Sequence, residues 1–66
     1  MKNTIKVERA KLNMTQQELA DHIGVSRQTI NSIETQKYIP STILALKISR
    51  FFKINTDAIF ELEDDD

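Results

Sequence analysis

The sequence predicts an all-α domain built from short helices. Its apolar residues recur at spacings of three and four residues, which is the period of a helix face, rather than alternating as they do in a strand. One glycine and one proline among 66 residues leave little material for hairpin turns. A chain of this length forms only one compact unit with a modest core. We therefore expect a folded domain over residues 1–62 and an acidic tail over residues 63–66.

The helices of the first half are marked by their flanking residues. A first helix is expected over residues 4–12. Thr15 and Glu18 form the capping-box pattern, in which each side chain satisfies a free amide at the helix start, and they predict a second helix over residues 16–23. Gly24 follows directly, where the left-handed conformation that ends a helix favours glycine.

Serine residues mark the next two helix starts. Ser26 is expected to cap a helix over residues 27–35, and Ser41 to cap another over residues 42–52, because a serine hydroxyl accepts a hydrogen bond from a free amide of the first turn. A short last helix is expected near residues 57–60. Five helices in all are therefore predicted.

Charge is distributed unevenly along the chain. The net charge is −1, yet residues 1–60 carry all nine basic residues and only five of the ten acidic ones, which gives this part a charge of +4. Such a body can approach phosphates. Residues 60–63 alternate apolar and charged side chains, which predicts an edge strand and a small terminal β pairing. The like charges of residues 63–66 predict a solvated, disordered tail.

The residues that catalysis or metal binding would need are scarce. There is no cysteine, so neither a disulfide nor a thiolate metal site is expected. His22 is the only histidine and has no partner acid three or four residues after it, and Ser26 and Ser32 have no evident base. We expect no enzyme activity, no metal and no cofactor. No segment has the length of a signal peptide or a membrane span, so a cytoplasmic location is expected.

Four small or apolar residues between residues 16 and 33 have the spacing of two helices that cross through a short turn. Ala20 and Gly24 are the fifth and ninth residues of this unit, and Ile30 and Ile33 are the fifteenth and eighteenth. A small side chain is needed where two helices cross steeply through a short turn, and Ala20 supplies it. The alternative is an ordinary bundle of two amphipathic helices. The polar outer face of the second helix favours a DNA-reading pair instead.

Two further features join the segments Thr15–Ala20 and Gly24–Ile30, namely Glu34 and Pro40–Ser41. Through these residues the chain resembles, over nearly its whole length, the Cro/C1 repressor type of helix-turn-helix regulators. The resemblance implies the five-helix lambda-repressor-like fold in a short, stand-alone form that has no separate small-molecule ligand domain.

The resemblance also implies that the second helix of the pair enters the DNA major groove. Arg27 suits guanine O6 and N7, and Gln28 suits adenine N6 and N7, each discriminating by about 1 to 3 kcal/mol. Ordinary solvated surface residues are the alternative. The expected base-reading residues are Ser26, Arg27, Gln28, Asn31 and Ser32.

Contacts to the phosphate backbone are expected on both sides of the reading helix. Gln16 and Gln17 open the second helix, where free amides and the helix dipole favour a phosphate. Lys37 and Tyr38 follow the reading helix and offer a charge and a phenol hydroxyl. The alternatives are surface glutamines and a tyrosine that packs on the core.

Arg9 and Glu34 match a pair that forms a salt bridge in this family, and we expect them to play that structural role. The chain departs from the family pattern at two places. Glu8 stands where many relatives carry an apolar residue, and Thr35–Gln36 replaces the Asn-Gly type of pair that usually ends the reading helix.

Function is expected to require two copies of the chain. One domain touches only a few base pairs, so we expect a homodimer on a palindromic operator of double-stranded DNA, with reading helices about 34 Å apart. The candidate interface consists of the apolar residues near the C-terminus, which could alternatively close the core: Ile54, Ile59, Phe60 and Leu62.

The function expected from these features is transcriptional regulation, with repression by occupation of promoter DNA. Two alternatives stay open. One is an antitoxin whose acidic C-terminus folds on a basic partner protein. The other is a helical protein-interaction module that has lost DNA binding.

Overall fold

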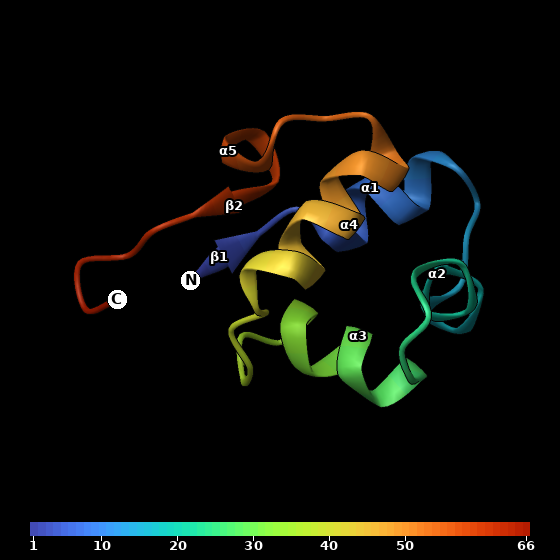
Figure 1. Ribbon diagram of the computed structural model, residues 1–66, viewed down its shortest axis with the longest axis horizontal. Coiled ribbons are helices and arrows are strands. Elements are labelled where there is room, and N and C mark those ends of the chain that lie inside the picture. Colours follow the sequence, from blue (N-terminus) through green and yellow to red (C-terminus); the bar gives the residue numbers. More distant parts are fainter.

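The computed structural model describes all residues from 1 to 66 and shows five short helices around one core (Figure 1). Two short strands from the ends of the chain pair antiparallel, with Lys2 opposite Glu61 and Asn3 opposite Phe60. The predicted all-α class with a small terminal β pairing is confirmed. In chain order the elements are β1 (Lys2–Asn3), α1 (Ile5–Lys11), α2 (Gln16–Ile23), α3 (Arg27–Glu34), α4 (Thr42–Phe52), α5 (Thr56–Ile59) and β2 (Phe60–Glu61).

Three helices begin at the capping residues that the sequence indicates. The hydroxyl of Thr15 accepts a hydrogen bond from Glu18 N–H at 3.0 Å, and the Glu18 carboxylate accepts one from Thr15 N–H at 3.0 Å. The bond from that backbone amide lowers the pKa of Glu18. Ser26 and Ser41 cap α3 and α4 in the same way, through backbone amides three residues further on. Local chemistry therefore determines where α2, α3 and α4 start.

The turn between α2 and α3 depends on Gly24. Its φ of 88° lies in the left-handed region, and its N–H donates to the carbonyl of Ala20 at 2.8 Å. Ala20 is fully buried, where the two helices meet. In Figure 1, α2 is seen nearly end-on while α3 lies across the view, so the predicted steep crossing is present.

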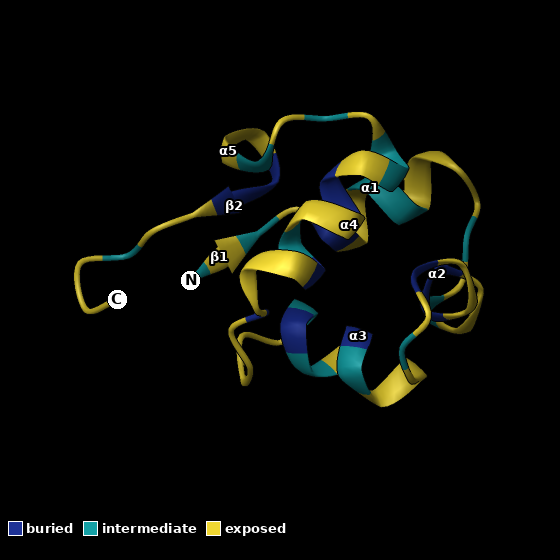
Figure 2. Ribbon diagram, viewed as in Figure 1, coloured by how far each residue is buried: buried dark blue, intermediate teal, exposed yellow.

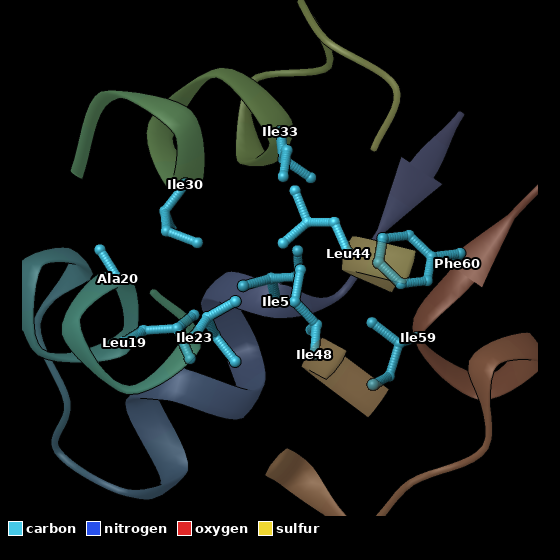
Figure 3. Packing of buried hydrophobic residues seen from close by; sticks show 10 residues of the cluster. All are labelled: Ile5, Leu19, Ala20, Ile23, Ile30, Ile33, Leu44, Ile48, Ile59 and Phe60. Carbon is cyan, nitrogen blue, oxygen red and sulfur yellow. The ribbon is translucent and has the colours of Figure 1, made fainter. Parts of the chain in front are cut away.

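The core is formed by ten apolar side chains from every helix and from β2. Figure 2 shows that the buried parts of the helices face inward, and Figure 3 shows their side chains converging. The helix-spaced apolar residues of the sequence thus form one continuous core. Its members are Ile5, Leu19, Ala20, Ile23, Ile30, Ile33, Leu44, Ile48, Ile59 and Phe60.

Two of the four residues expected at a dimer interface belong to this core. Ile59 is 2% exposed and Phe60 is 7% exposed, so they close the core, and their assignment to a subunit interface is corrected. The physical reason is that the pairing of β1 with β2, together with the packing of α5 against α4, places the end of the chain against the core. Ile54 is half-buried against the core, whereas Leu62 is 78% exposed.

The acidic tail, for which the charge pattern predicts disorder, forms a turn against the start of the chain. The Met1 ammonium lies 3.1 Å from Asp66 Oδ1 and 3.2 Å from Glu63 Oε1, and Glu63 N–H donates to Asp66 Oδ2 at 2.7 Å. Hydrogen bonding to Asp66 raises the pKa of the Met1 amine, and the bond from Glu63 N–H lowers the pKa of Asp66. The ammonium offsets repulsion among the carboxylates.

None of the five helices combines the length and the apolar character that a bilayer crossing requires.

Gln36 also adopts the left-handed conformation, with φ at 63°. It stands where the family pattern has a glycine-containing pair, and the chain makes the turn after α3 without glycine. A residue with a Cβ atom pays about 1 to 2 kcal/mol for this conformation. The turn after α3 is therefore kept at a cost in stability.

We expect Gly24→Ala to destabilise the fold and Gln36→Gly to stabilise it. A Cβ at Gly24 would meet no atom within 4 Å, so the loss is backbone strain alone. The smaller entropy of the unfolded alanine chain offsets part of it, which leaves a net loss of about 1 kcal/mol. Denaturant titration, monitored by circular dichroism, measures the change in the free energy of unfolding for both variants. Equal stability of all three proteins would contradict the conformational explanation.

Candidate nucleic-acid interface

Helix α3 separates an apolar face from a polar one. Ile30 and Ile33 are 0% and 1% exposed and pack into the core. The opposite face carries the residues expected to read bases, and nothing in the fold covers it (Figure 2). Ser26, Arg27, Gln28 and Asn31 are exposed there, and Ser32 is half-buried.

The first residue of α2 lies directly against this polar face. Gln16 Nε2 donates to Asn31 Oδ1 at 3.1 Å and to Glu34 Oε1 at 3.2 Å, and Gln16 Oε1 accepts from Arg27 Nη1 at 3.4 Å. The sequence suggested only a phosphate contact for Gln16. Its contacts with two expected base readers depend on the angle between α2 and α3, for which the sequence carries no local signal.

The ion pair between Arg9 and Glu34 is confirmed, and it joins α1 to the end of α3. Arg9 donates from Nε to Glu34 Oε2 at 2.7 Å and from Nη2 to Glu34 Oε1 at 2.9 Å. A third bond runs from Arg9 Nη1 to the carbonyl of Met14 at 2.8 Å. The side chains of Arg9 and Glu34 are only 13% and 5% exposed. The hydrogen bonds to Glu34 raise the pKa of Arg9, which favours the charged guanidinium.

The two residues expected to bind phosphate after α3 are held by their backbone. The amides of Lys37 and Tyr38 both donate to the carbonyl of Ser32, at 2.9 and 3.2 Å. Tyr38 is 45% exposed, so it lies at the surface rather than in the core. It lines a shallow hollow together with Ser26, which caps α3, and with three side chains of α3, namely Gln28, Thr29 and Ser32.

Gln17 stands apart from the contacts that surround Gln16. It is exposed, and its Nε2 donates to Asp21 Oδ1 at 2.8 Å, one turn further along α2.

Glu8, the other departure from the family pattern, is half-buried and pairs with Lys11 at 3.3 Å. A polar residue is thus accommodated on α1 without an unpaired buried charge.

No three of the histidine, aspartate and glutamate side chains lie close enough together to hold a metal ion. His22 is exposed and stacks at a tilt on Phe51, with 5.0 Å between the ring centres. What the surface around α3 can do is donate and accept hydrogen bonds over an extended polar face.

Comparison with known proteins gives a consistent result. The helix-turn-helix family model matches residues 5–59. The chain is 53% identical over 66 residues to an uncharacterised HTH-type transcriptional regulator of Methanocaldococcus jannaschii, and the match covers 100% of both chains. It is 42% identical over 65 residues to the uncharacterised HTH-type transcriptional regulator YgzD of Bacillus subtilis, covering 98% of each.

A solved structure with a similar fold is that of the P22 c2 repressor protein in complex with the synthetic operator 9T. The TM-score is 0.76 at 28% sequence identity, over 80% of each chain. At this TM-score the two chains share one fold.

We expect a double-mutant cycle to show strong coupling between Arg9 and Glu34. Arg9→Met leaves a buried carboxylate unpaired and should cost about 3 kcal/mol of folding free energy. The double variant Arg9→Met/Glu34→Leu should lose less than either single variant, because no buried charge remains. Denaturant unfolding gives the folding free energy of the unaltered protein, the two single variants and the double variant. Additive losses would show that the two residues act independently.

Proposed function

The chain belongs to the helix-turn-helix family of Cro/C1-type transcriptional regulators, and on that premise we propose that it binds specific double-stranded DNA with α3 in the major groove. The proposal rests on the difference between the two faces of α3, one apolar and buried and the other polar and exposed. The helix buries Ile30 and Ile33 completely and leaves a row of polar side chains facing outward. A helix of this kind fits the width of the major groove.

Arg27 and Gln28 are the proposed centre of sequence recognition. Both lie in the first turn of α3, where side chains of a groove-bound helix reach base edges. The Arg27 guanidinium can donate two bonds to guanine O6 and N7, and the Gln28 amide can bond to adenine N6 and N7. Ser26, Asn31 and Ser32 extend the same surface.

Phosphate contacts on both sides would orient α3 in the groove. Lys37 and Tyr38 supply a charge and a hydroxyl beyond its C-terminal end. Both Gln16 Nε2 hydrogens already have acceptors in Asn31 and Glu34, so we assign its phosphate contact, with that of Gln17, to the backbone amides at the start of α2. Such contacts position the domain without reading sequence.

The distribution of charge favours an approach by this surface. Residues 1–60 carry a charge of +4, and the remaining acids lie at the C-terminal end. In Figure 1, the tail extends to the left beyond the strands, whereas α2 and the start of α3 lie at the right. This arrangement keeps the acids of the tail at the other end of the molecule from the start of α3, and salt further weakens repulsion between exposed charges.

We further propose that two copies bind a palindromic operator in the cytoplasm and repress transcription by occupying a promoter. One α3 reaches only a few base pairs, and pairing two at about 34 Å provides the affinity and length that a unique site needs. Of the four residues expected at the interface, Leu62 and Ile54 are the two that lie outside the buried core, with Leu62 78% exposed and Ile54 half-buried. They support a twofold contact at the C-terminal end.

We expect Arg27→Ala and Gln28→Ala to lose the preference for the cognate operator over a scrambled duplex. Weak, salt-sensitive binding should remain, because phosphate contacts survive. Lys37→Ala should instead weaken binding to both duplexes equally and lower the salt slope by about 1. Fluorescence anisotropy at several salt concentrations separates these patterns. Unchanged discrimination in both α3 variants would refute the assignment.

We expect Leu62→Asp to weaken the dimer and its binding to a palindromic duplex, while binding to a half-site stays as it is. Introducing two like charges at a twofold contact is unfavourable for association. Val7→Asp is the matched control, because Val7 is another exposed apolar side chain, at 53%, on α1. Analytical ultracentrifugation and titration of both duplexes give the readout. Equal effects of the two substitutions would contradict a contact at Leu62.

A further inference from the structure

We propose that the Arg9–Glu34 ion pair, acting through Gln16, fixes the side-chain amide of Asn31 so that its Nδ2 hydrogens face the DNA. Asn31 would then read a base edge that accepts hydrogen bonds and reject the cytosine amino group. The inference rests on the proposed function and adds the chemical class of base that one residue selects. Arg9, Glu34 and Gln16 are positioning residues in it.

The first step is the fixed polarity of the ion pair. An arginine side chain only donates hydrogen bonds, and an ionised carboxylate only accepts them. Both oxygens of Glu34 accept from Arg9, at 2.7 and 2.9 Å, and the Glu34 side chain is 5% exposed. The carboxylate is therefore held in one place with an acceptor, Oε1, directed towards α2.

The second step is the orientation of Gln16. A glutamine amide has a donating end and an accepting end, and rotation by 180° exchanges them. The end that lies 3.2 Å from Glu34 Oε1 must be Nε2, because a carboxylate cannot donate. The other end faces Arg27 Nη1 at 3.4 Å, and a guanidinium cannot accept, so it must be Oε1. Two charged neighbours of opposite sign thus impose the same orientation.

The third step passes this orientation to the reading helix. The second hydrogen of Gln16 Nε2 points to the side chain of Asn31 at 3.1 Å, and the atom that receives it must be the acceptor, Oδ1. Nδ2 is then the other end of the Asn31 amide, on the exposed face of α3. An asparagine without this contact could present either end to a base.

The consequence is a preference for certain bases. In the major groove guanine offers O6 and N7 as acceptors, adenine offers N7 and thymine offers O4, whereas cytosine offers the N4 amino group as a donor. Two donors meeting at hydrogen-bond distance leave both unsatisfied. The base that faces Asn31 should therefore be one of the three acceptor-bearing bases.

Selection from a pool of random duplexes tests the inference with variants that keep the fold. Asn31→Ala locates the operator position that Asn31 reads, because selectivity should fall there. Asn31→Asp keeps an acceptor for Gln16 and removes both hydrogens, so the preferred base at that position should change to cytosine, by about tenfold. Gln16→Ala should admit cytosine beside the original base, since the Asn31 amide can then rotate.

His22→Ala is the control on the same helix. It removes an exposed polar side chain of α2, yet His22 stacks on Phe51 of α4, with 5.0 Å between the ring centres, and has no contact with α3 in this network. The selected sequence should stay unchanged. Thermal unfolding of every variant shows whether it is folded, and the exposed Asn31 variants decide the question if Gln16→Ala is not.

The outcomes separate the two levels of the argument. If Asn31→Ala relaxes no position, if Asn31→Asp selects the original base, or if folded Gln16→Ala remains as selective as the unaltered protein, the inference is overturned. If the unaltered protein itself selects no sequence from the pool, the proposed function fails instead.

Discussion

The close crossing of α2 and α3 is the constraint on which the rest of the structure depends. Ala20 allows the two helices to approach, and Gly24 turns the chain in the left-handed conformation, with φ at 88°. A larger side chain at Ala20 would separate the helices. Only this approach brings Gln16 within hydrogen-bond distance of the outward face of α3. Packing inside the molecule and the arrangement of polar groups outside it thus have one origin.

The Arg9–Glu34 ion pair occupies the boundary between these two regions. It is buried enough that its charges must remain paired, and it lies close enough to the surface for Glu34 to contact Gln16 at 3.2 Å. A structural feature of the core edge therefore also determines how polar atoms are presented to solvent. Family resemblance alone assigns the pair to stability, and the distances add this second role.

Local signals made most of the helix boundaries predictable. Thr15, Ser26 and Ser41 satisfy free amides within three residues of themselves, so their effect needs no information from distant parts of the chain. The outward polar face of α3 was predictable for the same reason, because a helix repeats every 3.6 residues. Ile59 and Phe60 were different. An apolar residue near the end of a chain suits a core or an interface equally well, and the pairing of β2 with β1 places both in the core.

The sequence by itself determined the presence of five helices, the starts of α2, α3 and α4, the glycine turn and the polarity of the outward face of α3, since each follows from interactions between residues a few positions apart. The tertiary structure alone decided which polar atoms meet across helices. Arg9 and Glu34 are 25 residues apart, and Gln16 and Asn31 are 15 apart. Contacts at such separations depend on helix crossing angles and on side-chain rotation. These are properties of the packed molecule, because many small interactions set them together.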